Sequence, residues 1–210
     1  MRSTGGPTRA DRRTLIVGGG LAALVVVALV LAFALTRGGS SSAAPRVIPW
    51  SQLGALQDGP PPWNNAVAQL QDRLAPLGLN QLTSEGTVLH IHQHLDLYVN
   101  GKSVALPAGI GIYPNSFLTE VHVHDTSGVI HVESPTNTTF TLGQLFGEWG
   151  VKLTRSCVGR YCGHLTWWLN GVKMTSDPAS LVLAAHQEIA IAAGPPPLVV
   201  PKSYAFPQGE

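Results

Sequence analysis

The chain of 210 residues predicts one α+β domain with a mixed sheet, preceded by a single transmembrane helix. Three observations lead to this fold class. An uncharged apolar run fills residues 14–36, segments with a period of two begin near residue 87, and short segments with helical spacing interrupt them. A β-grasp-like sheet is the candidate arrangement, although the order of its strands does not follow from the sequence.

The apolar run contains LIVGGGLAALVVVALVLAFAL and, as a helix, would be roughly 34 Å long, enough to cross a bilayer. A cleavable signal peptide has a shorter apolar region of roughly 7–15 residues, although SSSAAP downstream resembles a weak cleavage site. The length favours a retained anchor over residues 14–36.

Charges on either side of the run predict the orientation of the chain in the cell membrane. The segment before it carries four arginines, whereas only Arg37 and Arg46 follow closely. Because positive charges stay on the cytoplasmic side, residues 1–13 are expected to form a cytoplasmic tail and the later domain to lie outside.

The remaining chain divides by composition. Residues 37–46 include GGSSSAAP and predict a flexible linker. Residues 47–194 are expected to form the extracytoplasmic domain, and residues 195–210 a proline-rich tail with no core of its own.

From Val47 onward, the chain carries seven Lys and Arg and eleven Asp and Glu, so this part is acidic and nucleic acid is excluded as a partner.

The first helix is expected within residues 63–79, where Val67, Leu70 and Leu74 recur at helical spacing and Gly78 marks the end. We expect this helix to pack against the core and to have no further role. A second short helix is expected within residues 141–150, which begin with the capping-box pair Thr141 and Gln144 and end at a glycine.

The main strand is expected over LHIHQHLDLYVNG, residues 89–101, which ends in an Asn-Gly turn signal. Side chains alternate between the two faces of a strand, so leucine, isoleucine and valine form one face. The opposite face carries His90, His92, His94, Asp96 and Tyr98.

The segment EVHVHDTSGVIHVES, residues 120–134, repeats this pattern as a hairpin around the turn DTSG. If Asp125 pairs with Gly128, His122 lies directly opposite His131. Two further strands are expected within residues 164–174 and 186–194, and a more irregular one after the Asn-Gly turn.

Six histidines on polar strand faces predict a transition-metal site, because H-x-H on a strand places two imidazoles on one face. Imidazole nitrogen suits Zn²⁺ or Cu²⁺, whereas Mg²⁺ and Ca²⁺ prefer oxygen. The six converge only if the two strand units are neighbours. The candidate ligands are His90, His92, His94, His122, His124 and His131.

Six imidazoles exceed one tetrahedral shell, so either two ions bind or some rings lie in the outer shell. Asp96, Asp125 and Glu133 are candidates to orient ligating rings through the second ring nitrogen. A hydrogen-bonded polar network without metal and a pH sensor are the alternatives. His164, on the polar face of its strand, is an intermediate case, and His186 is expected in a turn.

Cys157 and Cys162 are expected to form a local disulfide outside the membrane. The alternative is a thiolate contribution to a copper site. A methionine-rich copper(I) carrier is not indicated, because Met174 and Met1 are the only methionines.

Three blocks, HIHQHLDLYVNG, HVHDTSGVIHVESP and TFTLGQLFGEWGV, resemble those of an uncharacterised family of bacterial membrane-anchored or secreted proteins. The resemblance covers about a third of the chain, between His90 and Val151 with gaps. It implies that the blocks form one unit and adds nothing about chemistry.

Three functions are compatible with these features. The first is sensing, buffering or delivery of zinc or copper at the cell surface. The second is a zinc-dependent hydrolase or hydratase with Glu133 or Asp125 as the base. The third is an envelope interaction module with a polar histidine network. The protein partner, if there is one, does not follow from the sequence.

Overall fold

The computed structural model describes Met1 and residues 47–209. Residues 47–209 form a small mixed α+β domain. The predicted cytoplasmic tail beyond Met1, the anchor and the linker all lie outside the described residues. Within the described part, none of the helices has both the length and the apolar character needed to cross a membrane.

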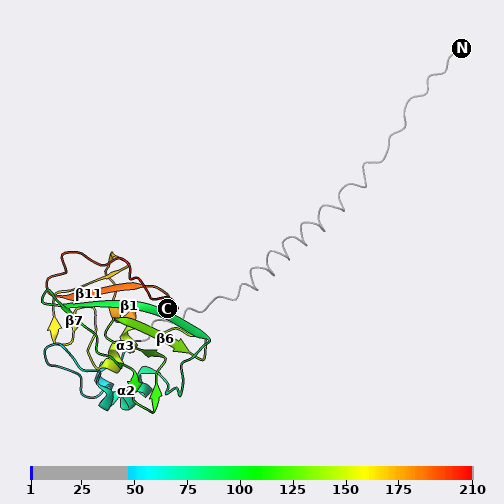
Figure 1. Cartoon of the computed structure of the whole chain (residues 1–210). Helices are drawn as coiled ribbons and strands as arrows, with labels where there is room; N and C mark the ends of the chain where they lie inside the picture. Colours follow the sequence, from blue (N-terminus) through cyan, green and yellow to red (C-terminus); the bar gives the residue numbers. More distant parts are fainter. Residues whose placement is uncertain (2–46, 210) are drawn as a thin grey trace. The chain divides into compact units, whose positions relative to one another are not determined.

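The domain is built on a sheet of seven strands in the order β10-β9-β11-β1-β6-β5, with β2 paired to β1 as well. Strands β11, β1 and β6 of this sheet lie side by side in Figure 1. Its strands are β1 (Leu89–Val99), β2 (Lys102–Val104), β5 (Val121–His122), β6 (Val129–Ser134), β9 (Leu165–Leu169), β10 (Val172–Met174) and β11 (Glu188–Ala193). Strands β1 and β11 are parallel, and the other pairs are antiparallel. The sheet is therefore mixed, as the sequence predicts.

Two short hairpins lie outside this sheet. One pairs β3 (Ile112–Tyr113) with β4 (Phe117–Leu118), and the other pairs β7 (Cys157–Val158) with β8 (Tyr161–Cys162). Cys157 and Cys162 are bonded to each other, which confirms the predicted disulfide. The cysteines are therefore not available as thiolate ligands in this structure.

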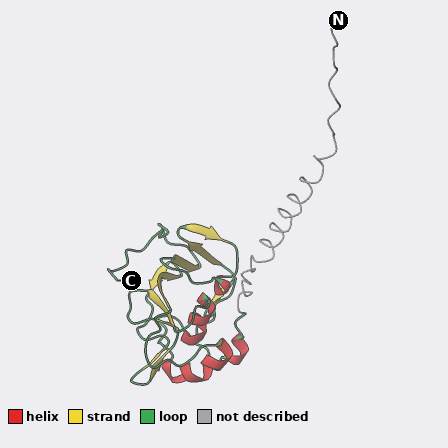
Figure 2. Cartoon of the chain, turned by 90° about the vertical axis from the view of Figure 1, so that its right-hand side faces the viewer, coloured by secondary structure: helices red, strands yellow, loops and turns green. Residues whose placement is uncertain are grey.

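Helices α2 (Leu70–Leu77) and α3 (Leu142–Trp149) lie together on one side of the sheet (Figure 2). The predicted capping box of Thr141 and Gln144 is present, and α3 is buried along its whole length. A Cβ atom on Gly147 would lie 2.5 Å from a methyl carbon of Leu77, so glycine allows the two helices to approach closely. The described residues also contain the 3₁₀ turns η1 (Trp50–Gln52), η2 (Val67–Gln69) and η3 (Pro178–Ser180).

The central strand β1 separates the core from the polar face. Leu95, Leu97 and Val99 are buried in the main apolar core, as the alternation predicts. Asn100 and Gly101 both have positive φ, the backbone that a tight hairpin turn to β2 requires. The histidines of β1 consequently lie on the face away from the helices.

The C-terminal segment, expected to be a proline-rich tail with no core of its own, packs against the domain. Val200 packs against a small apolar cluster that contains Trp168, and the ring of Tyr204 stacks on His94 with centroids 3.9 Å apart. Phe206 in turn contacts the rings of Tyr204 and His186. This segment therefore covers part of the sheet. Its aromatic residues explain why it packs there, although its proline-rich composition did not indicate such packing.

Candidate metal centre

Three histidines form a row across three neighbouring strands. His92 on β1 lies directly opposite His131 on β6, and His131 lies directly opposite His122 on β5. The ring centroids of His92 and His131 are 4.5 Å apart, and those of His122 and His131 are 5.5 Å apart. The predicted pairing of His122 with His131 is confirmed, and the two histidine-bearing strand units are neighbours.

Two further histidines extend this row. His90 precedes His92 on the same face of β1, with ring centroids 4.9 Å apart. Strand β5 ends at His122, so His124 lies in the following loop and not on a longer strand, but its ring still lies 4.4 Å from that of His131. We refer to the five rings as the imidazole cluster: His90, His92, His122, His124 and His131.

Glu133 lies among these rings and is almost completely buried. Its Oε1 atom is 3.1 Å from Nδ1 of His131 and 3.3 Å from Nε2 of His90. Its Oε2 atom is 3.8 Å from Nε2 of His122. The carboxylate predicted as an outer-shell partner therefore lies close enough to act as a ligand.

His122, His124, His131 and Glu133 form the largest candidate group in the described part of the chain, because one ligand atom from each lies within 4.8 Å of all the others. The Nε2 atoms of His122 and His124 are 3.1 Å apart. Two nitrogens bound to one tetrahedral zinc ion are about 3.3–3.4 Å apart, so only a small adjustment is required.

Thr119 sets the orientation of the His122 ring. The Nδ1–H group of His122 donates a hydrogen bond of 2.8 Å to the Thr119 carbonyl oxygen. In the neutral ring this leaves the lone pair on Nε2, the atom that faces His124. Such a hydrogen bond is the usual outer-shell partner of a metal-binding histidine, and sequence patterns do not reveal it because the acceptor is a backbone carbonyl.

Burial keeps the central imidazoles neutral. It lowers the pKa of His122 to about 4, although the hydrogen bond to Thr119 and the charge of Glu133 oppose the shift. Burial, followed by the charges of His131 and His90, also lowers the pKa of His92 to about 4. Burial alone would raise the pKa of Glu133, but the surrounding histidines outweigh it and lower this pKa. At neutral pH His92 and His122 are therefore neutral and Glu133 is a carboxylate, the forms that bind metal.

The imidazole cluster is buried at its centre and open at its ends. The side chains of His90 and His124 are 45% and 42% exposed. Glu85, in a loop before β1, approaches Nε2 of His124 at 3.6 Å, and no pattern in the sequence marks this residue. Solvent and ions thus have access to the cluster at its two ends.

His94, the third histidine of the opening motif, does not join the cluster. Its Nδ1 atom is 2.9 Å from Oε2 of Glu188, and its Nε2 atom is 3.0 Å from the carbonyl oxygen of Ser127. Burial alone would lower the pKa of His94, but Glu188 and Asp96 outweigh it and raise this pKa. Because both ring nitrogens face oxygen acceptors, His94 is held as one half of a buried ion pair.

Glu188 is the functional residue that sequence reasoning missed. It lies opposite His94 in the β1–β11 register, where its only signal is a charged residue at the start of an alternating strand. With His94 and with Asp96, whose carboxylate is 3.9 Å from the His94 ring, it forms another, smaller candidate group. Asp125 is exposed and accepts a hydrogen bond from the Ser127 N–H group, so it stabilises the turn after β5.

Comparison with known proteins returned no match: no family model, no curated protein and no solved structure is similar to this chain. The function proposed below therefore depends on the geometry and chemistry of the described residues. The described residues include largely buried histidine and glutamate groups that could hold a metal ion.

Proposed function

We propose that the domain binds Zn²⁺ or Cu²⁺ through His122, His124, His131 and Glu133, and that it senses, buffers or delivers this metal at the cell surface. The observation that carries the proposal is the convergence of four candidate ligand atoms within 4.8 Å, three of them from buried residues. Three imidazoles and one carboxylate suit these two ions and disfavour Mg²⁺ and Ca²⁺, which prefer oxygen ligands.

A hydrogen-bonded network is the competing description. Since His122 donates from Nδ1, its Nε2 atom can accept a hydrogen bond from His124, and the 3.1 Å separation fits this contact too. Such a network would satisfy His122 but leaves Nε2 of His92 and Oε2 of Glu133 buried without a partner. The unsatisfied atoms favour an additional ligand in the cluster.

Elemental analysis of the full-length chain, purified without a polyhistidine tag, tests the proposal. We expect at least one equivalent of zinc or copper per chain, removable by a chelator. Returning Zn²⁺ at about 100 times its Kd is expected to increase the free energy of unfolding by about 2.7 kcal/mol. Addition of Mg²⁺ is the matched control and is expected to have no effect. A chain that binds neither zinc nor copper would support the hydrogen-bonded network.

The cellular location is part of the proposal. The uncharged run over residues 14–36 and the arginines before it support an anchor with the domain outside the cell. Protease added to intact spheroplasts is therefore expected to digest the domain and spare an N-terminal tag, with permeabilised cells as the control. Protection of the domain in intact spheroplasts would reverse the proposed orientation.

A further inference from the structure

Glu133 belongs to two candidate metal groups at once. One is the group proposed above, and the other consists of His90, His92 and Glu133, again with one ligand atom from each within 4.8 Å. We propose that His90 and His92 bind a second ion and that the Glu133 carboxylate bridges the two ions. This inference rests on the proposed function, because it requires the first ion to be bound.

The two oxygens of Glu133 face different sides of the cluster. Oε1 lies 3.3 Å from Nε2 of His90 and 4.0 Å from Nε2 of His92. Oε2 lies 3.8 Å from Nε2 of His122. A carboxylate that places one oxygen toward each set of nitrogens has the arrangement of a bridging ligand. Two ions bound in this way would be about 3.5–4 Å apart.

Two buried atoms in this region have no hydrogen-bond partner. They are Nε2 of His92 and Oε2 of Glu133. The side chains of these two residues are 5% and 2% exposed. Buried polar atoms in folded proteins are almost always paired, so an unpaired nitrogen and an unpaired oxygen in one cluster favour a bound ligand. One ion on each side of Glu133 would supply a partner for both atoms.

His131 is compatible with the bridge. Its Nδ1–H group donates to Oε1 of Glu133 at 3.1 Å, which leaves Nε2 as the nitrogen with the lone pair. A carboxylate oxygen has two lone pairs, so Oε1 can accept this hydrogen bond and also bind an ion. The same contact fixes the ring orientation, as outer-shell carboxylates do for ligating histidines.

The second ion is expected to be the weaker one. It has three protein ligands, so water or an anion must complete its coordination, and the exposed side chain of His90 gives access for either. Repulsion between two dications also lowers the affinity for whichever ion binds last. The two binding events should therefore be separate steps in a titration.

Zn²⁺ titration of the full-length, untagged protein tests this inference. Wild type is expected to bind two ions per chain, and His90→Ala one ion. Because His90 is exposed, this variant is expected to keep the melting temperature of the metal-free wild type. His164→Ala removes another exposed histidine outside the imidazole cluster and is expected to bind two ions.

Electron paramagnetic resonance of the Cu²⁺-loaded protein tests the bridge. A carboxylate-bridged pair is expected to show magnetic coupling and a reduced signal per copper, whereas His90→Ala is expected to show the full signal of a single ion. One ion in both wild type and His90→Ala would overturn the second site and leave the proposed function standing. Two uncoupled ions would overturn the bridge, and binding of no ion would overturn both proposals.

Discussion

Replacing His124 by alanine is expected to weaken binding of Zn²⁺ or Cu²⁺ at the first site by at least about 100-fold. Loss of an outer-shell partner already costs about 10–100-fold in affinity, and loss of a direct ligand costs more. The side chain of His124 is 42% exposed in a loop, so its removal leaves the metal-free fold within about 0.5 kcal/mol of wild type. Competition titration against a chromophoric chelator measures the affinity.

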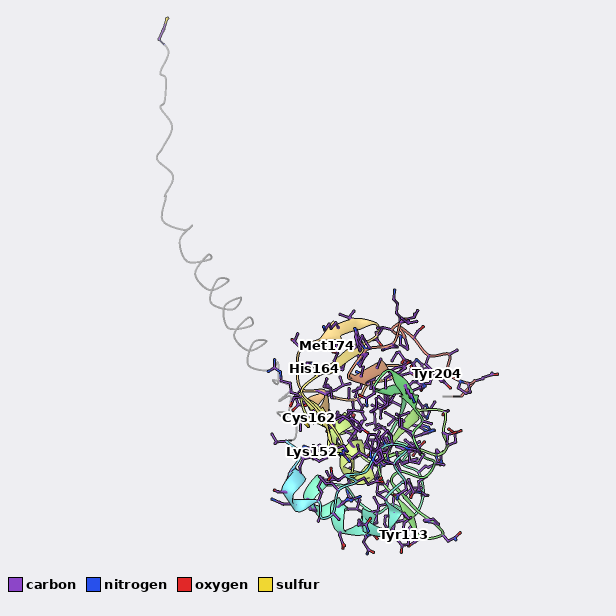
Figure 3. All side chains as sticks on the ribbon, turned by 90° about the vertical axis from the view of Figure 1, so that its left-hand side faces the viewer. Tyr113, Lys152, Cys162, His164, Met174 and Tyr204 are labelled. Atoms are coloured by element: carbon purple, nitrogen blue, oxygen red, sulfur yellow. A yellow bond between two sulfur atoms is a disulfide. The ribbon has the colours of Figure 1, made fainter. Side chains whose placement is uncertain are left out.

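His164→Ala is the matched control, because it also removes an exposed histidine and is expected to bind metal as wild type does. Figure 3 shows His164 near Cys162 and well apart from Tyr204, whose ring stacks on His94 beside the cluster strands. If His124→Ala keeps wild-type affinity, His124 is not a ligand. The first site would then lack the fourth donor on which the proposal depends.

Protonation of His92 and His122 is expected to destabilise the metal-free protein as the pH falls. His92 and His122 have pKa values of about 4 in the folded state, against about 6.5 in the unfolded chain. The unfolded chain therefore takes up protons first as the pH falls, and stability is lost progressively between about pH 6.5 and pH 4. For His122, which is completely buried, the loss is on the order of 3 kcal/mol.

Urea unfolding of chelator-treated protein at a series of pH values measures this effect. His122→Asn is the informative variant, because its amide nitrogen takes the place of Nδ1 and can still donate to the Thr119 carbonyl oxygen, but its side chain does not titrate. Its stability is expected to depend less steeply on pH than that of wild type. His94 acts in the opposite direction: its raised pKa stabilises the fold at low pH, and this contribution is lost as the pH rises through that pKa. The same pH dependence in wild type and in His122→Asn would contradict the assignment of His122 as a buried neutral ring.

Local patterns in the sequence predicted the elements that carry the site. Alternation over residues 89–99 identifies β1 and its two faces, because the period of a strand is a property of the backbone itself. The turn DTSG places His122 opposite His131, because the length of a hairpin loop sets its register. These features depend on neighbouring residues and are readable without the fold.

The contacts that the sequence did not reveal depend on pairing between residues far apart in the chain. His94 continues the same alternation as His90 and His92, yet it lies where β1 passes from its pairing with β6 to its pairing with β11. Glu188 meets it only because β11 is parallel to β1, an arrangement that no local pattern specifies. Likewise Glu85 approaches His124 from a loop, and Tyr204 reaches His94 from a proline-rich segment.

The two hydrogen bonds of the His94 ring also imply an order of assembly. The bond to Ser127 closes a loop of 33 residues, and the bond to Glu188 closes a loop of 94 residues. Closing the longer loop costs about 0.9 kcal/mol more in chain entropy, and non-local strand pairing is slow to form. Strands β1, β5 and β6 are therefore positioned to assemble first, and they carry the whole imidazole cluster except His124, which follows β5 directly. The nascent chain can accordingly present these rings before β11 has been added to the sheet.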